Sequence, residues 1–283
     1  MSLPPDLIPE PARPDLDAYF ERIGYSGSTS PTLDVLAALQ RLHPAAIPFE
    51  AVDVFLGRPV DISPAAVERK LIGARRGGYC YEQNGLFKRV LTALGYQVTG
   101  LIGRVQWQVA EDAPERPRTH MALKVRVRGN DWLADVGFGG STLTAPVLWM
   151  LETPQTTPHG TYRLVAKGPE TVLQQEVDGE WMRVYTLSPD PQIDVDYLPA
   201  NWWSSAHPEG HFRKNLIAAR SPEGMRLNLL NNRLTVRPVD GEPVRRQLDV
   251  DGLERCLADD FGLPVEPDWR PALVRAVENG EQA

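Results

Sequence analysis

The chain has 283 residues, of which 42% are hydrophobic and 24% charged, and its formal net charge is −7. This length predicts roughly two or three packed units, and the composition excludes a chain that is disordered throughout. An acidic chain has no general attraction for phosphate backbones, so nucleic acid is not an expected partner. No apolar run is long enough to cross a membrane, and residues 1–11 lack the features of a secretion signal. The two cysteines cannot form a disulfide framework, so we expect a cytoplasmic protein with no membrane partner.

The first third of the sequence has the apolar spacing of helices. After an irregular, proline-rich lead-in over residues 1–14, large apolar residues recur every three or four positions. Ser63-Pro64 is an N-cap followed by proline at the first helical position. We predict helices over residues 16–23, 32–43, 63–74 and 80–94.

After Gly95 the pattern changes to short runs rich in β-branched and aromatic residues, separated by turn signals. The predicted strands cover residues 98–109, 121–127, 132–136, 161–166, 171–177 and 181–187, in an antiparallel, barrel-like sheet. The last third is mixed, with predicted strands over 213–219, 225–230 and 233–236 and helices over 250–261 and 269–279. This order predicts an α+β fold class with segregated units.

Cys80 is a candidate nucleophile because of its position. It follows Arg76-Gly77-Gly78-Tyr79 and lies in the first turn of a predicted helix. The partial positive charge of a helix N-terminus favours thiolate over thiol, and its free N–H groups can bind an oxyanion. The alternative is a small buried residue at a helix start, which is the common situation of a lone cysteine.

His120 and Asp135 are the candidate partners of this thiol. His120 opens a predicted strand after a loop, and Asp135 ends the next strand, where a buried carboxylate requires donors. A tight turn at Gly129-Asn130-Asp131 would make the two strands neighbours. Residues paired across that turn have numbers that sum to about 260, near the 255 of His120 and Asp135. Taken separately, His120 could be a satisfied structural histidine, and Asp135 could be a helix or turn cap. With Cys80 they follow the order of a thiolate–imidazolium–carboxylate triad.

Several segments together resemble the signatures of the arylamine N-acetyltransferases. Residues 76–84, Arg-Gly-Gly-Tyr-Cys-Tyr-Glu-Gln-Asn, are similar to the family's Arg-Gly-Gly-x-Cys motif, and residues 135–139, Asp-Val-Gly-Phe-Gly, to a second motif. Ile-Pro-Phe-Glu at 47–50, followed by Leu-Gly-Arg-Pro-Val at 56–60, resembles a third, and residues 212–216 resemble a weaker C-terminal pattern. The set occurs in the family's order and spacing.

The resemblance implies that Cys80 accepts the acyl group, His120 is its base and Asp135 orients the imidazole. It implies ping-pong chemistry with acetyl-CoA as co-substrate and an arylamine or arylhydrazine as the small-molecule acceptor. The chemistry is consistent, because coenzyme A leaves a thioester as a thiolate and a neutral aniline attacks without prior deprotonation.

The resemblance also implies roles around this triad. Phe49 and Phe138 would line the acceptor pocket, although both could equally be core packing. Glu50 and Arg76 would form a structural ion pair, with Arg75 as the alternative partner. The chain at Gly139 and Gly140 would give backbone clearance near the passage of coenzyme A. Cys256 is expected to be inert core. No metal is expected, because neither cysteine has the sequence partners of a zinc site.

Three units follow from the resemblance. Residues 1–95 would form a helical bundle that carries Cys80, residues 96–205 a β unit that carries His120 and Asp135, and residues 206–283 an α/β lid. The triad core would be similar to that of a cysteine protease, with coenzyme A entering between the β unit and the lid. The oligomeric state is expected to be a monomer or a homodimer.

Three other functions fit the same residues. A thiol peptidase or transglutaminase-like enzyme would use the same triad, and an amide synthase of secondary metabolism would take its acyl chain from a carrier protein. A non-catalytic binding module would keep the fold with an unreactive Cys80. The aromatic pair Trp202-Trp203 has no assigned role.

Overall fold

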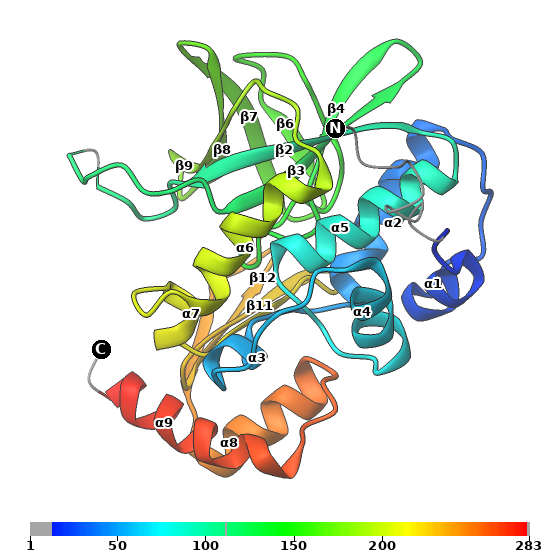
Figure 1. Ribbon diagram of the computed structural model, residues 1–283. Helices are drawn as coiled ribbons and strands as arrows, with labels where there is room; N and C mark the ends of the chain where they lie inside the picture. Colours follow the sequence, from blue (N-terminus) through cyan, green and yellow to red (C-terminus); the bar gives the residue numbers. More distant parts are fainter. Residues whose placement is uncertain (1–12, 111, 282–283) are drawn as a thin grey trace, which may run out of the picture.

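The computed structural model describes residues 13–110 and 112–281, and the first part of the described chain is helical (Figure 1). Its elements are α1 (Leu16–Ile23), α2 (Leu33–Ala46), β1 (Phe49–Glu50), α3 (Val52–Phe55), α4 (Pro64–Glu68), the π-helix η2 (Arg69–Gly73) and α5 (Cys80–Ala93). The side chain of Thr32 caps α2 by accepting the backbone N–H of Val35. The four helical regions predicted from the sequence are confirmed, but α2 continues three residues beyond the predicted end at position 43 and contains Pro44.

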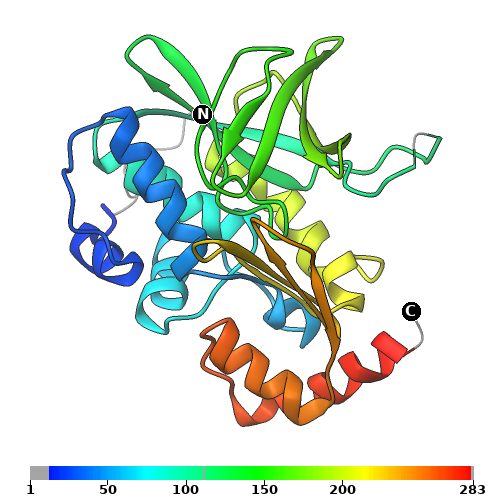
Figure 2. The same cartoon turned by 180° about the vertical axis from the view of Figure 1, so that it is seen from behind.

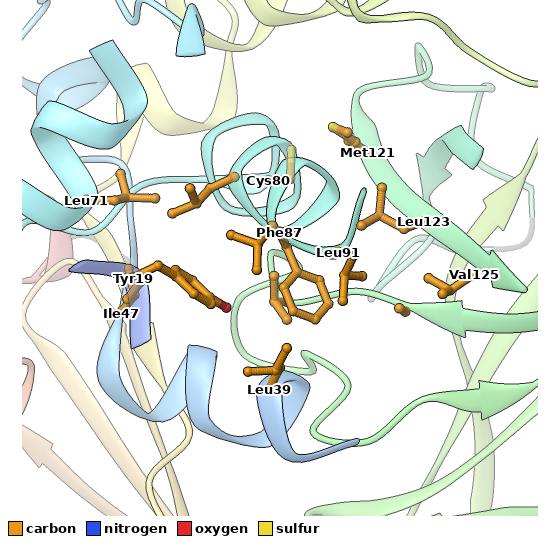
Figure 3. Close-up of a cluster of buried hydrophobic side chains, with 14 of the residues drawn as sticks. Tyr19, Leu39, Ile47, Leu71, Cys80, Phe87, Leu91, Met121, Leu123 and Val125 are labelled. Atoms are coloured by element: carbon orange, nitrogen blue, oxygen red, sulfur yellow. The ribbon is translucent and has the colours of Figure 1, made fainter. Parts of the chain in front are cut away.

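Helix α5 is the centre of the largest hydrophobic core. It packs against β3 (His120–Val127) and α4, and the buried faces of α1 and α2 join the same cluster. Figure 3 shows ten labelled members of this core, with Phe87 and Leu91 of α5 between Leu39 of α2 and Val125 of β3. Cys80 belongs to this cluster, so the start of α5 is anchored by apolar packing.

The middle of the chain forms an antiparallel sheet in the order β5-β4-β3-β2-β9-β8-β7-β6. Apart from β3, its strands are β2 (Gln97–Val105), β4 (Asn130–Ala134), β5 (Val147–Leu148), β6 (Gln155–Thr157), β7 (Gly160–Lys167), β8 (Glu170–Val177) and β9 (Glu180–Leu187). The Gln155 side chain on one edge strand bonds both the N–H (2.7 Å) and the C=O (2.9 Å) of Leu148 on the other. This bridge nearly closes the sheet, so the predicted barrel-like unit is confirmed. Strand β2 ends four residues before the predicted position 109.

The hairpin β3–β4 has a different register from the predicted one. Leu123 pairs with Ala134, so the paired numbers sum to 257, because the turn is the two-residue Arg128-Gly129 with positive φ at both positions. An even sum of 260 would have put the side chains of His120 and Asp135 on opposite faces of the hairpin. The odd sum puts them on the same face, as diagonal neighbours.

A second sheet has the order β1-β10-β11-β12-β13 and is formed mainly by the last third of the chain. Its C-terminal strands are β10 (Ile217–Arg220), β11 (Met225–Leu230), β12 (Arg233–Pro238) and β13 (Val244–Gln247). The orange and red C-terminal helices pack on it (Figure 2), namely α8 (Val250–Arg255), the π-helix η4 (Cys256–Asp260), the 3-10 helix η5 (Pro267–Trp269) and α9 (Arg270–Glu281). Phe49 of β1 pairs with Ala219 and also bridges Gly78, so the N-terminal and C-terminal parts meet beside the cysteine loop.

The segment between the two sheets corrects the sequence prediction. It contains the 3-10 helix η3 (Asp194–Asp196), α6 (Tyr197–Ala206) and α7 (His211–Lys214), whereas a strand was predicted over residues 213–219. The strand begins only at Ile217. Helix α6 was not predicted because its buried face is largely polar and its tryptophans, Trp202 and Trp203, are exposed, which inverts the usual apolar stripe.

The helices, the barrel-like sheet and the second sheet with its helices confirm the α+β class. No helix in the described part of the chain is both long and apolar enough to span a membrane. The division into units at positions 95 and 205 stays a prediction, because strand β1 and the α5 core both connect parts of the chain across these boundaries.

Candidate active site

The cysteine loop is held close to the chain segment before β1. Gly77 is required here, because a Cβ atom on it would lie 2.1 Å from the Pro48 carbonyl oxygen. The Glu82 carboxylate accepts the Tyr79 backbone N–H at 2.9 Å and so caps the start of α5. Cys80 is the first residue of this helix, and its Sγ lies 3.6 Å from the Thr119 carbonyl oxygen, next to His120 in sequence.

The structure brings His120 and Asp135 into direct contact. His120 Nε2 and Asp135 Oδ2 are 2.7 Å apart and both side chains are buried. Burial lowers the pKa of His120, but the Asp135 charge and the hydrogen bonds with Asp135 and Cys80 outweigh it and raise the pKa to about 10. With Nε2 bonded to Asp135, the Nδ1 atom remains for the thiol. The imidazole is therefore held as a cation beside Cys80 at neutral pH.

Asp135 has further donors that the sequence analysis did not identify. Its Oδ1 accepts the Asn84 side-chain amide and the Gly137 backbone N–H, each at 2.8 Å. Asn84 also accepts the Val136 N–H, so it ties the aspartate turn to the helix of Cys80. Burial raises the pKa of Asp135, but the His120 cation and these hydrogen bonds lower it by more, so the pKa is below its ordinary value. Asn84 is the last residue of the 76–84 segment that resembles the family motif, and that resemblance is the one sequence feature that could have identified it.

Two aromatic rings enclose the imidazole. The Phe138 ring lies edge-on to His120 with centroids 5.1 Å apart, and the Tyr185 ring is tilted against it at 4.7 Å. Burial, together with the nearby Asp135 charge, raises the pKa of Tyr185 well above its ordinary value. Tyr185 is on β9, and nothing in its local sequence marked it as a neighbour of the site.

The predicted pocket residues lie close together. A Cβ atom on Gly139 would be 3.5 Å from the Phe49 ring, so the turn that carries Phe138 packs on Phe49. Gly140 gives clearance to Asn228 of β11, whose Oδ1 would be 2.9 Å from such an atom. The two glycines therefore give room to this chain's own side chains.

The partner of Glu50 is Arg76. The alternative, Arg75, is exposed. Arg76 Nη2 lies 2.8 Å from Glu50 Oε1, and both side chains are buried. The same guanidinium lies 3.2 Å from Asp53, which also contacts Lys70 at 2.8 Å and Arg58 at 3.6 Å. Lys70 also binds Glu82 at 2.7 Å, so a network of charges, buried at both ends and partly exposed at Asp53 and Lys70, runs from β1 to the start of α5. Burial raises the pKa of this Glu82 above its ordinary value.

The remaining candidates lie elsewhere. Cys256 is buried at the start of η4, in the core between the C-terminal helices and the second sheet. Within residues 13–110 and 112–281, no group of three or more His, Cys, Asp and Glu side chains is arranged to hold a metal ion.

Comparisons with known proteins identify the family to which this fold belongs. A family model described as N-acetyltransferase matches residues 32–270, which defines the class of protein. An arylamine N-acetyltransferase of Escherichia coli is 42% identical over 255 residues, covering 89% of this chain and 90% of that protein. The chain belongs to the arylamine N-acetyltransferase family, whose members are acyltransferases.

One solved structure and one more distant relative add detail. The arylamine N-acetyltransferase of Mycobacterium marinum in complex with CoA superposes with a TM-score of 0.88 at 40% identity, covering 93% of this chain and 98% of that one. A proansamycin X synthase of Amycolatopsis mediterranei is 35% identical over 187 residues, covering 65% of this chain and 71% of that protein. The sequence similarity therefore extends to a protein that is named as a synthase.

Proposed function

We propose that this chain is an acetyl-CoA-dependent arylamine N-acetyltransferase that works through an acetyl-Cys80 thioester. The observation that carries the proposal is the buried 2.7 Å contact between His120 and Asp135 beside the start of α5. A carboxylate that orients an imidazolium next to a thiol is the arrangement that activates a cysteine nucleophile.

In the first half-reaction the Cys80 thiolate attacks the acetyl carbonyl of acetyl-CoA. The bond from the carbonyl carbon to the coenzyme A sulfur breaks, and the coenzyme A thiolate takes a proton from His120. In the second half-reaction the amine nitrogen attacks the thioester carbonyl and His120 accepts the amine proton. Cys80 leaves as thiolate, which regenerates the ion pair.

Other residues of the site support this cycle. Asp135 orients His120, and Phe49 and Phe138 line the acceptor side, where flat rings suit an arylamine or arylhydrazine. The Glu50–Arg76 pair is structural, and Gly139 and Gly140 are close to the route of coenzyme A. We assign no metal to the reaction. We place the protein in the cytoplasm, as a monomer or a homodimer. Each chain would have three units, divided near residues 95 and 205.

The test is mass spectrometry of the intact protein after brief mixing with acetyl-CoA. We expect one acetyl adduct on the parent and none on Cys80→Ala, with discharge of the adduct by an added aniline or arylhydrazine. Cys256→Ala is the matched control and should acquire the adduct like the parent. No adduct on a parent whose Cys80 is still readily alkylated would overturn acetyl-CoA as donor.

A second candidate is an amide synthase fed by an acyl carrier, favoured by the 35% identity to the proansamycin X synthase. It predicts that Cys80 is acylated by a carrier-bound long acyl chain faster than by acetyl-CoA. Parallel reactions with the two donors at equal concentration separate the candidates.

A further inference from the structure

Gln83 makes an unusually complete set of contacts for a residue outside the proposed triad. It lies one turn after Cys80 on α5 and is 0% exposed. Its Nε2 donates to the carbonyl oxygens of Pro48 at 2.8 Å and Gly78 at 3.2 Å, and a third carbonyl, that of Ile47, lies at 3.4 Å. Its Oε1 lies 2.6 Å from His43 Nε2. Because carbonyls only accept, the amide nitrogen must face them and the amide oxygen must face His43.

This orientation defines the tautomer of His43. The Gln83 oxygen only accepts, so His43 Nε2 carries the proton, and Nδ1 accepts from the Tyr19 hydroxyl at 2.9 Å. Tyr19 and His43 are both 0% exposed. Burial lowers the pKa of His43 to about 4, so the ring is neutral at physiological pH. A directed chain of hydrogen bonds therefore runs from Tyr19 through His43 to the Gln83 carboxamide.

The groups at the end of this chain lie beside the proposed reacting atoms. Pro48 immediately precedes Phe49, and Gly78 lies two residues before Cys80. Gln83 also packs against the turn after Asp135, because a Cβ atom on Gly137 would be 3.1 Å from the Gln83 Cβ. One side chain thus contacts three segments that carry Phe49, the nucleophile and the carboxylate.

We propose that Gln83 is a positioning residue for acetyl transfer, an inference that rests on the proposed function above. The carboxamide, oriented by His43 and Tyr19, holds the Pro48–Phe49 backbone at a set distance from the cysteine loop. That distance determines how an aromatic acceptor that packs on Phe49 meets the acetyl group on Cys80. Loss of the carboxamide should therefore affect transfer to an aromatic acceptor more than transfer to a small one.

The principal experiment compares Gln83→Met with Gln40→Met. Gln40 is a suitable control because it is also 0% exposed and donates to two backbone carbonyls, those of Leu143 at 3.4 Å and Ala145 at 3.1 Å. Both substitutions remove a buried carboxamide of the same size. For each variant the acetyl-Cys80 enzyme is prepared with acetyl-CoA, and the rates of its discharge by aniline and by hydrazine are measured separately.

For Gln83→Met we expect the aniline rate to fall by about 10- to 100-fold, since a displacement of about 1 Å has effects of this size. The hydrazine rate should fall much less, because hydrazine has no ring to be positioned. Gln40→Met should keep the parent's ratio of the two rates. A ratio equal to the parent's in both variants would overturn the role of Gln83, because a merely structural residue lowers both rates together.

Two further measurements keep the inference testable if Gln83→Met does not fold. His43→Phe keeps a ring between Tyr19 and Phe87 but removes the donor to Gln83, and it should shift the ratio in the same direction by a smaller factor. Nitrogen-15 NMR of the parent should show His43 protonated on Nε2, and the opposite tautomer would overturn the hydrogen-bond chain. No acetyl adduct on the parent would overturn the proposed function and this role with it, whereas an adduct with an unchanged ratio would overturn this role alone.

Discussion

The two cysteines of this chain are equally buried and yet lie in opposite chemical surroundings. Each is 4% exposed and unpaired, and each is the first residue of a helical element. Cys80 begins α5 after a glycine turn and faces the His120 cation, whereas Cys256 continues α8 without interruption into η4. Burial, followed by the charge and hydrogen bond of Asp260, raises the pKa of Cys256 to about 12. Since the two thiols are equally buried, we expect any difference in their reactivity to come from the sign of the neighbouring charge and from the free N–H groups of a helix start.

The largest difference should be in alkylation by iodoacetamide. A pKa of about 12 leaves roughly one Cys256 thiol in 10⁵ ionised at pH 7. His120, with its pKa raised to about 10, stays protonated below that pH and loses its charge as pH rises through it. We therefore expect Cys80 to be alkylated at a nearly constant rate from pH 6 to 9, measured by mass spectrometry in Cys256→Ala. In Cys80→Ala the remaining thiol should react about tenfold faster with each pH unit. A Cys80 alkylation rate that falls about tenfold per pH unit below about 8.5, the ordinary pKa of a free thiol, would contradict the ion pair.

The second largest effect should be on the rate of Cys80 acetylation when Asp135, the proposed partner of His120, loses its charge. Asp135→Asn removes the charge that keeps His120 protonated, and we expect the rate of acetylation of Cys80 to fall by about 10²- to 10⁴-fold. The pH profile of the remaining activity should move to lower pH, because the pKa of His120 drops when its charged partner is lost. Asp131→Asn, on the same hairpin but paired with exposed Arg126, should acetylate at the parent rate. Equal rates for both variants would remove Asp135 from the mechanism.

The stability of the cysteine loop should depend on its buried ion pair. Glu50 is 0% exposed, and Glu50→Gln leaves Asp53 as the remaining charged partner of Arg76, which costs up to about 3–5 kcal/mol. Near Cys256, Asp251 pairs with Arg270 at the surface, and Asp251→Asn should leave the urea midpoint almost unchanged. Equilibrium urea unfolding of the two variants measures the contrast. Similar midpoints would mean that Asp53 is a sufficient partner for Arg76.

The smallest effects are expected from two glycines that differ in their surroundings. A Cβ atom on Gly137 would lie 2.9 Å from the Cys80 Cα, so Gly137→Ala must push the aspartate turn away from α5 and should cost about 1–3 kcal/mol. Gly85, on α5 itself, has no atom within 4 Å of such a position, so Gly85→Ala should stabilise the protein by about 0.5–1 kcal/mol. Thermal unfolding distinguishes them. A neutral Gly137→Ala would show that the turn relaxes without strain.

The sequence predicted the parts of the fold that depend on local patterns. The stripe of α1 and α2 and the alternating runs of β7, β8 and β9 were identified, because apolar periodicity reports directly on burial. Helix α6 was missed because Asn201, Ser204 and Ser205 face inward while Trp202 faces solvent. In that helix the buried residues are held by hydrogen bonds, which hydrophobic patterning does not detect.

The amino-acid sequence by itself determined which reactive groups this protein has and their order along the chain. Cys80 after two glycines, His120 at a strand start and Asp135 before a glycine turn are local features, and their chemistry follows from residue type. Only the tertiary structure decided which groups touch. The odd register of one hairpin places His120 and Asp135 on the same face. The choice of Arg76 over Arg75 by Glu50 depends, in the same way, on how distant segments pack, and no local pattern encodes such contacts.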